Sequence, residues 1–283
     1  MSNDHTIAAA RSAGQLTRDL ASYLEFAKEV AELGGRVAID RFGKHNERKK
    51  KDDGTWATEA DWKTEAQMRL RIARTFPDHN ILGEEEGLTS AGGGPPRDGA
   101  PTWVLDPIDG TNNYIAGIPI WATLVGLQLE GRAQVGVAHA PAIGETYDGA
   151  VGLGARMNGT RIGIDPIDDL SDALFVFASG RAFEQTGWKD LFHTLLDRTG
   201  RSRGFGDFWG HMLVARGAAH IMVEPTLRVW DVVALQPIVT EAGGKLTQLD
   251  GSSWSDERSC VTTNGVLHDE VLRLAAEMPA RGG

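Results

Sequence analysis

WVLDPIDGTNNY, residues 103–114, ends an apolar run with two aspartates three positions apart. Asp-Pro and Asp-Gly are turn dipeptides, so Asp106 and Asp109 on their own predict a tight turn after a strand. If a helix begins at Gly110, its unpaired N–H groups and its dipole face whatever lies beside the aspartates. Carboxylates for cations next to amides for an anion indicate a metal-bridged phosphate site, which is an arrangement for hydrolysing a phosphomonoester.

A second acidic stretch lies upstream, where the apolar run at residues 80–83 is followed by three glutamates at residues 84–86. An acidic triplet alone is more typical of a solvated loop. Two predicted strands, however, deliver Glu84 and Asp106 at their C-terminal ends, where open α/β sheets place their sites. With Asp109 they supply hard oxygen ligands in the number and proximity that Mg²⁺ binding requires.

Two helices are predicted before these strands. Apolar or small residues recur every three or four positions over residues 16–42, which predicts a long amphipathic helix. Residues 1–15 are small and polar, and we expect them to be disordered. A second helix is predicted from Thr58, because Thr58 and Asp61 have the spacing of a capping box, and Pro77 ends it.

The rest of the chain predicts hairpins and then alternating elements. Hairpins are expected over residues 121–139 and at Asn158-Gly159, a strong two-residue turn signal. The alternating elements that follow indicate an α/β layer. They are strand 174–178, helices 188–198 and 208–216, strand 220–223, a helix from residue 230, strands 245–249 and 260–263, and helix 269–278.

Length, charge and cysteine content limit the class of protein. The chain has 283 residues, enough for two domains of ordinary size or one large one. Its formal net charge of -10 argues against nucleic acid as a partner. The charge leaves room for divalent cations. The longest apolar runs are too short to span a bilayer, so we expect no membrane partner. Cys260 is the single cysteine, which excludes an intrachain disulfide and fits a cytoplasmic protein.

Three stretches together resemble the signatures of the inositol monophosphatase family in motif, order and spacing. They are ILGEEEG (81–87), WVLDPIDGTNNY (103–114) and VWDVVALQPIVTEAGGKL (229–246). The similarity runs from about Leu20 to Leu274. The resemblance implies an α/β (α+β) fold, a layered α/β/α/β/α sandwich of the sugar-phosphatase type, in a homodimeric, Mg²⁺-dependent phosphomonoesterase. It also implies two or three Mg²⁺ ions, Mn²⁺ as a substitute, inhibition by Li⁺ and a small phosphorylated substrate.

We therefore expect two sub-domains with the site in the cleft between them. Residues 16–165 form the N-terminal α+β part, which binds metal and phosphate. Residues 166–283 form the C-terminal α/β part, which binds the rest of the substrate. The boundary is placed near the second DPID stretch, at 165–168, which lacks the following Gly-Thr and is interpreted as a linker.

The metal ligands follow from the resemblance residue by residue. It implies that Glu84, Asp106 and the backbone carbonyl of Ile108 hold the first metal. The second metal is held by Asp106, Asp109 and Asp231, with Asp106 bridging the two ions. Asp231 alone would be interpreted as a helix-start aspartate that complements the helix dipole.

The resemblance also assigns the residues around water and phosphate. Glu84, with Glu85, and Thr111 orient the attacking water, while the Gly110 and Thr111 amides receive the phosphate. Asp61 matches the family's helix aspartate, which hydrogen-bonds the threonine, here Thr111. This role competes with the capping role of Asp61, and we favour the catalytic one.

The basic run at residues 48–51 is by composition a solvated loop before a helix. The resemblance instead places one of its lysines, Lys51 or, with the gap shifted by one, Lys50, in the family's mobile loop at the phosphate.

The substrate is predicted from residues 204–231, because in this family the region contacts the alcohol part of the substrate. Asp207, within GDF, resembles the histidinol-phosphate phosphatases of bacteria and plants, as do GIPIWATLVGL (117–127) and TTNGVLHDEVL (262–272). Histidinol phosphate carries an ammonium group, with which Asp207 and Glu224 would pair.

Further residues of this region have weaker assignments. Asn112 is also assigned to substrate binding. Phe205, Phe208 and Trp209 offer an aromatic wall to the imidazole, although each is more typical of a core. His211 and His220 are single residues on expected helix or strand faces, and we expect structural roles for both.

Two alternative functions stay open beside histidinol phosphate hydrolysis. The first is inositol 1-phosphate or another polyol or sugar phosphate, because Glu224 also matches a glutamate that reads substrate hydroxyls in inositol phosphatases. The second is a non-catalytic regulatory factor of the same fold, associated with RNA or a polymerase. The completeness of the metal motif argues against the second.

Overall fold

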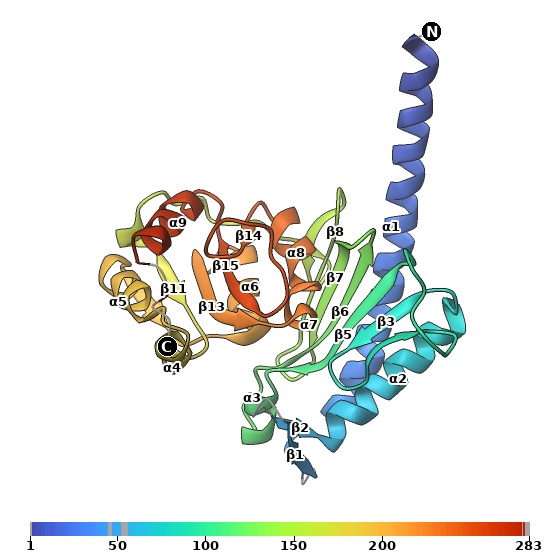
Figure 1. Cartoon of the computed structure of the whole chain (residues 1–283), viewed down its shortest axis with the longest axis horizontal. Coiled ribbons are helices and arrows are strands. Elements are labelled where there is room, and N and C mark those ends of the chain that lie inside the picture. Colours follow the sequence, from blue (N-terminus) through green and yellow to red (C-terminus); the bar gives the residue numbers. More distant parts are fainter. Residues whose placement is uncertain (1, 45–46, 52–55, 279, 281–283) are drawn as a thin grey trace.

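The computed structural model describes residues 2–44, 47–51, 56–278 and 280, with side chains from residue 17 onward. Within these residues, none of the helices is both long enough and apolar enough to cross a membrane. Helices and sheets alternate in layers from one end of the molecule to the other (Figure 1). This layering confirms the α/β/α/β/α sandwich.

The larger sheet has eight strands in the order β10-β9-β8-β7-β6-β5-β3-β4. Its strands are β3 Asn80–Gly83, β4 Gly87–Ser90, β5 Thr102–Asp109, β6 Ala122–Leu129, β7 Arg132–Ala140, β8 Glu145–Ala150, β9 Gly154–Met157 and β10 Thr160–Arg161. Only β3 and β5 pair in parallel, with Gly83 opposite Leu105. Their carboxyl ends therefore lie side by side, and the Glu84 N–H donates to the Leu105 carbonyl at 3.2 Å.

The smaller sheet has five strands in the order β12-β11-β13-β15-β14. They are β11 Leu174–Val176, β12 Arg201–Arg203, β13 Ile221–Leu227, β14 Lys245–Thr247 and β15 Arg258–Thr263. A separate two-stranded ribbon, β1 Arg48–Lys50 and β2 Trp56–Thr58, stands before α2. It brings the basic run to the same end of the molecule as the start of α2.

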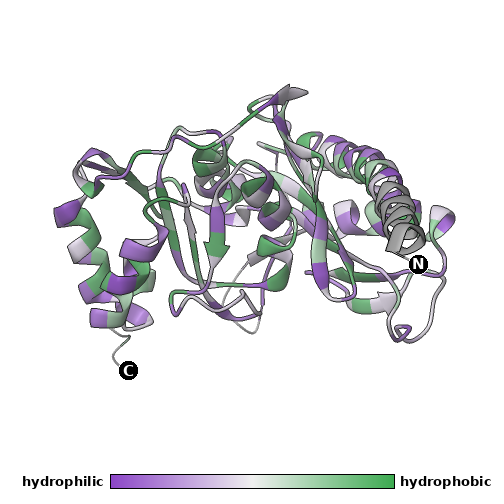
Figure 2. Cartoon of the chain, turned by 90° about the horizontal axis from the view of Figure 1, so that it is seen from above, coloured by the Kyte–Doolittle hydropathy of each residue, from purple (hydrophilic) through white to green (hydrophobic). Residues whose placement is uncertain are grey.

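Helices form the other layers. On one face of the larger sheet lie α1 Ser2–Ile39 and α2 Glu59–Thr75, and on the outer face of the smaller sheet lie α4 Gly180–Gln185, α5 Lys189–Arg198 and α9 His268–Glu277. Hydrophilic and hydrophobic residues alternate along these outer helices (Figure 2), as expected for elements with one buried face. Two short pieces, α3 Thr111–Ala116 and η1 Leu170–Asp172, complete this set.

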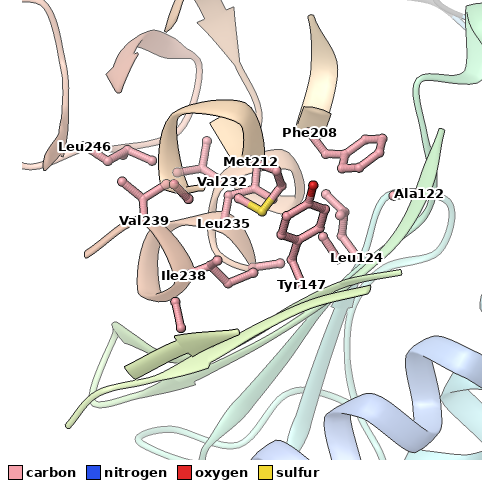
Figure 3. Packing of buried hydrophobic residues seen from close by; sticks show 14 of the residues in the cluster. Ala122, Leu124, Tyr147, Phe208, Met212, Val232, Leu235, Ile238, Val239 and Leu246 are labelled. Carbon is pink, nitrogen blue, oxygen red and sulfur yellow. The ribbon is translucent and has the colours of Figure 1, made fainter. Parts of the chain in front are cut away.

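The middle layer consists of α6 Asp207–Ala215, α7 Val229–Val232 and α8 Leu235–Glu241. Leu124 and Tyr147 of the larger sheet pack in one buried cluster with Met212 of α6 and Ile238 of α8 (Figure 3). The C-terminal half of the chain therefore shares a core with the N-terminal half. The predicted boundary near residue 165 falls between β10 and β11, and the two sub-domains stay a prediction.

Glycines in the larger sheet allow this close packing. A Cβ added to Gly136 of β7 would lie 1.8 Å from the Ala234 carbonyl oxygen, and one on Gly149 of β8 would lie 2.9 Å from the Ile238 Cα. At such distances a side chain would force the opposite backbone to shift. The backbone that follows α7 thus lies directly on the sheet, which fixes Asp231 close to the end of β5.

Several local predictions are confirmed. Thr58 is the N-cap of α2 and forms a capping box with Asp61. β6 and β7 form the first predicted hairpin. Asn158 and Gly159, with φ of 49° and 78°, form the turn between β9 and β10.

α1 begins at Ser2, and the predicted disorder of residues 1–15 stays a prediction. The helix predicted from residue 230 is divided into α7 and α8.

Candidate active site

A cavity of about 260 Å³ opens where the larger sheet meets the middle layer. It is lined by the ends of β5 and β13, the first residues of α3 and α6, and α7, with Trp56 of β2 at its edge. Of the predicted site residues, those that line it are Glu84, Asp106, Ile108, Asp109, Gly110, Thr111, Asn112, Asp207, Glu224 and Asp231. Asp61, Glu85 and Lys51 lie outside this lining.

Three carboxylates converge in the cavity. One oxygen from each of Asp106, Asp109 and Asp231 lies within 4.8 Å of the others. Burial and the neighbouring carboxylates raise the pKa of Asp106 and Asp109 well above the usual range. Burial likewise raises the pKa of Asp231 to about 7. Hard oxygen donors that repel one another at this spacing fit a divalent cation such as Mg²⁺, which would offset the repulsion.

Backbone groups fix the orientation of this triad. The Asp106 Oδ1 accepts the Ile108 N–H at 2.9 Å, and the Asp231 Oδ2 accepts the Arg228 N–H at 2.8 Å. The Asp109 Oδ2 accepts the Phe208 N–H at 2.6 Å, at the start of α6. Each carboxylate is thus held by a backbone hydrogen bond.

Glu84 lines the cavity but lies outside the triad, and its carboxylate pairs with a lysine. The Lys51 Nζ is 2.7 Å from the Glu84 Oε1 and 2.7 Å from the Glu85 Oε1. Trp62 donates its indole N–H to the other oxygen of Glu85 at 3.0 Å. Lys50, the alternative considered from the sequence, lies exposed in β1.

The start of α3 provides the anion-binding part of the cavity. Gly110 has a φ of 83° and precedes the helix, as the sequence predicts. The Thr111 hydroxyl donates to the Ile108 carbonyl at 3.0 Å. The first N–H groups of a helix have no partner within it, so those of Thr111 and Asn112 are available to an anion in the cavity.

Asp61 fills its capping role with one oxygen. Its Oδ2 accepts the Thr58 N–H at 2.8 Å and the Thr58 hydroxyl at 2.6 Å. Its Oδ1 is buried and has no hydrogen-bond partner. The predicted contact with Thr111 is not formed here, because the Thr111 hydroxyl donates to Ile108. The free Oδ1 shows that capping does not exclude a second role, contrary to the competition expected from the sequence.

Asp207 and Glu224 reach the cavity from different elements. Asp207 begins α6, and Glu224 lies in β13 opposite Cys260 of β15. Burial raises the pKa of Asp207 to about 6 and that of Glu224 well above its usual range. Two carboxylates in a shared pocket at this depth fit a cationic group of a ligand.

The aromatic wall differs from the expected one. Phe208 lines the cavity, but Phe205 and Trp209 are not among the lining residues. Trp209 packs on the middle core and donates its indole N–H to Glu145 at 3.0 Å, because α6 turns that side chain toward β8. Trp56 and Trp230 line the cavity instead. The sequence signal for Trp230 was its position directly before Asp231.

The two histidines expected to be structural have different environments. His220 accepts the Leu174 N–H on its Nδ1 at 2.8 Å, which ties β11 to β13. His211 lines the cavity, and its Nδ1 is 2.8 Å from the Thr262 hydroxyl. Burial lowers the pKa of His211 to about 4, so its ring is neutral. Its spacing of four residues from Asp207 on α6 was the signal that could have placed it here.

The layered fold and the carboxylate triad beside a helix start define a metal-dependent phosphatase. A model of the inositol monophosphatase family matches residues 19–280, and the chain belongs to this family. It is accordingly a phosphoric monoester hydrolase.

The chain is similar along most of its length to phosphatases of known name and to solved structures. The chain is 38% identical over 255 residues to a histidinol-phosphatase of Mycobacterium tuberculosis, covering 88% of this chain and 96% of that one. It is 33% identical to a fructose-1,6-bisphosphatase/inositol-1-monophosphatase of Aquifex aeolicus, covering 91% and 96%. Among solved structures, an inositol monophosphatase from Anabaena (Nostoc) superposes with a TM-score of 0.80 at 30% identity, covering 93% and 98%.

Proposed function

We propose that the chain is a histidinol-phosphatase, which hydrolyses L-histidinol phosphate to L-histidinol and phosphate in histidine biosynthesis. The substrate assignment depends mainly on the pair Asp207 and Glu224, a partly buried and a buried carboxylate in the same cavity as the metal triad. An ammonium group satisfies both, whereas a neutral polyol leaves their charge uncompensated. The similarity to proteins named histidinol-phosphatase supports this choice.

The proposal assigns two or three Mg²⁺ ions to Asp106, Asp109 and Asp231, with Glu84 and the Ile108 carbonyl completing the first ion's ligands. Bound Mg²⁺ supplies Lewis-acid stabilisation of the charge on the phosphate oxygens and on the leaving alkoxide. The Lys51 Nζ pairs with the Oε1 of Glu84, so the Oε2 of the same carboxylate would serve as the metal ligand.

The chain's own groups then bind phosphate and move protons. The Gly110 and Thr111 N–H groups hold the phosphate, and Lys51 adds a positive charge. Glu84, with Glu85, and Thr111 orient the attacking water and take its proton. The bond between phosphorus and the histidinol oxygen breaks as the new bond from water forms, and the leaving oxygen takes a proton from a solvent water. Asp61 supports Thr111, and Asn112 lies beside the substrate.

A second candidate is an inositol-1-monophosphatase or another polyol or sugar phosphate phosphatase. The specific observation in its favour is the 33% identity to a relative named for both fructose-1,6-bisphosphatase and inositol-1-monophosphatase activity. Glu224 would then accept hydrogen bonds from substrate hydroxyls.

Phosphate release from a panel of monoesters tests the proposal. The purified chain receives histidinol phosphate, inositol 1-phosphate or glycerol 2-phosphate, with Mg²⁺ and then with EDTA in excess. We expect the highest kcat/KM for histidinol phosphate and loss of release with EDTA. Equal or better turnover of inositol phosphate overturns the histidinol assignment in favour of the second candidate. The same proposal includes four further predictions. They are a homodimer, a cytoplasmic location, replacement of Mg²⁺ by Mn²⁺ and inhibition by Li⁺.

A further inference from the structure

Asp207 has an unusual backbone conformation for a residue in a substrate pocket. It opens α6 with a φ of 53°, in the left-handed region. Residues other than glycine rarely adopt this conformation, and it persists only where surrounding contacts hold it. The contacts that hold Asp207 therefore also decide where its carboxylate points.

One of these contacts comes from Asn113, in the last part of the metal and phosphate motif. The Asn113 Nδ2 donates to the Asp207 Oδ2 at 3.0 Å and to the Ile120 carbonyl at 2.9 Å. Both partners are acceptors, so only the NH₂ side of the amide can face them, and the orientation of Asn113 is unambiguous. Both donors of this amide are used, which fixes the Asp207 carboxylate with respect to α3.

The neighbouring residue adds a second connection. The Phe208 N–H donates to the Asp109 Oδ2 at 2.6 Å. The start of α6 is thus attached to the segment 109–113 through a backbone group and a side chain. As a result, the Asp207 Oδ2 lies 3.4 Å from the position that a Cβ on Gly110 would take. The carboxylate of α6 therefore stands directly beside the turn that is proposed to hold the phosphate.

This adjacency limits the ligand chemistry. A cation that pairs with Asp207 while its phosphate is bound at Gly110 has to lie within a few bonds of the ester oxygen. A 2-aminoalkyl phosphate, with the ammonium group on the second carbon from the ester oxygen, has this spacing. Histidinol phosphate belongs to this chemical class.

We propose that Asn113 is a positioning residue that makes the site selective for 2-aminoalkyl phosphates by holding the Asp207 carboxylate beside the phosphate turn. The inference rests on the proposed function in one respect, namely that Asp207 pairs with the ammonium group. It adds the substrate class and the residue that enforces it.

Two esters that differ in a single group test this inference. 2-Aminoethyl phosphate carries the ammonium group, and 2-hydroxyethyl phosphate replaces it with a hydroxyl. We expect wild-type enzyme with Mg²⁺ to prefer the amino ester. Asn113→Ala should raise the KM for the amino ester by about tenfold, the scale of one charge-assisted hydrogen bond. The kcat for the amino ester and the KM for the hydroxy ester should be nearly unchanged.

Asp207→Asn tests whether the two residues act together, since asparagine tolerates the left-handed backbone. It should lose the same preference, and the double variant should lose no more than Asp207→Asn alone, because coupled residues are not additive. A matched control is Asn80→Ala. Asn80 holds a loop through hydrogen bonds of 2.8 Å to the Arg97 backbone, at the opposite end of β3 from Glu84. It should leave the preference intact.

Several outcomes overturn the inference. They are an equal loss on both esters in Asn113→Ala, multiplied effects in the double variant, and a wild-type enzyme without preference for the amino ester. If Asn113→Ala does not fold, Asn113→Leu, which keeps the branched shape but has no donor, replaces it with the same expectations. Preference for the amino ester without turnover of histidinol phosphate contradicts the proposed function and leaves the inference standing. Turnover of histidinol phosphate without a preference for the amino ester supports the proposed function and contradicts the inference.

Discussion

Three acidic residues that the resemblance assigns to catalysis or to metal binding also accept backbone N–H groups at helix starts. Asp61 accepts a backbone N–H at the start of α2, Asp231 at the start of α7 and Asp109 at the start of α6. Capping occupies one oxygen of each carboxylate and also orients the side chain. From the sequence, capping and catalysis were alternatives for Asp61 and Asp231. The geometry makes them compatible, because a carboxylate has two oxygens.

Residue types and spacing predict many of the side chains that line the cavity, but not all of them, and not which of them touch. Glu84, Asp106 and Asp109 follow from strand ends that the sequence indicates. The bond between Asn113 and Asp207 joins residues 94 positions apart. No local pattern encodes such a contact, since it depends on the placement of α6 over α3. The choice of Lys51 over Lys50 likewise depends on the direction of a short strand.

Asp106→Asn tests the centre of the metal site. Asp106 is the most central carboxylate of the triad in the proposal, and an amide keeps its size but removes its charge. We expect kcat/KM with Mg²⁺ to fall by at least about 100-fold, because the loss of metal-assisted charge stabilisation costs several kcal/mol. Calorimetric titration with Mg²⁺ should show weakened binding, independently of turnover.

Glu224→Gln is the comparison for this variant. It removes a buried carboxylate of the same cavity that is not part of the triad. It should keep metal binding and change the ranking of substrates in the panel. Near-wild-type turnover by Asp106→Asn would rule out its bridging role.

Elements whose stabilising contacts are local were predicted well. The capping box of α2 and the Asn158-Gly159 turn each involve residues close in the sequence. β8 was missed, since ETYDGA has no continuous apolar or alternating pattern. It is a strand because β7 and β9 pair with it on both sides. The division of the predicted helix at residue 230 into α7 and α8 also follows from packing on the sheet.

Gly136→Ala tests how α8 is placed on the larger sheet. The added Cβ would meet the Ala234 carbonyl oxygen at 1.8 Å, so the backbone between α7 and α8 has to move. Overpacking of this kind costs about 1–3 kcal/mol of unfolding free energy. Because Asp231 lies three residues before Ala234, the same shift should weaken Mg²⁺ binding. Chemical denaturation and calorimetry measure the two effects.

Gly163→Ala serves as the control for this substitution. The nearest heavy atom to its added Cβ is the Ala242 carbonyl oxygen at 3.6 Å, an ordinary contact. This variant should match the wild type in Mg²⁺ affinity and lose little stability. If Gly136→Ala were equally well tolerated, the close seating of α8 would not be what positions Asp231.

The whole molecule concentrates negative charge where its layers meet. Carboxylates from three layers line the cavity. They are Asp106 and Asp109 of the larger sheet, Asp207 and Asp231 of the middle layer and Glu224 of the smaller sheet. The order of the three motifs was readable in the sequence. Their convergence was not, because it requires the middle layer to share one core with the larger sheet.

This burial predicts how the stability of the metal-free protein depends on pH. Burial raises the pKa of Asp61 and Asp231 to about 7 and that of Asp207 to about 6, from 3.8. Between about pH 4 and pH 7 these three carboxyl groups bind more protons in the folded than in the unfolded chain, so their contribution to stability falls as the pH rises. Described histidines whose pKa burial lowers, His211 among them, oppose this trend, but they are fewer than the carboxyl groups whose pKa is raised. With EDTA present, we expect a higher Tm at pH 5.5 than at pH 7.5. A Tm that rises over this interval in wild type would contradict the shifts.

A divalent cation should reverse this trend, because it replaces the protons that the carboxylates share. At a Mg²⁺ concentration about 100 times Kd, binding to the folded state alone adds about 2.7 kcal/mol. For a chain of this size that corresponds to a rise in Tm of roughly 4–5 °C. The rise should be larger at pH 7.5 than at pH 5.5, since protons compete with the ion for the same oxygens. Differential scanning fluorimetry of wild type and Asp231→Asn measures it. Asp231→Asn removes one of the three converging oxygens and should lose most of the rise. An equal rise in both proteins would mean that the stabilising ion binds elsewhere on this acidic chain.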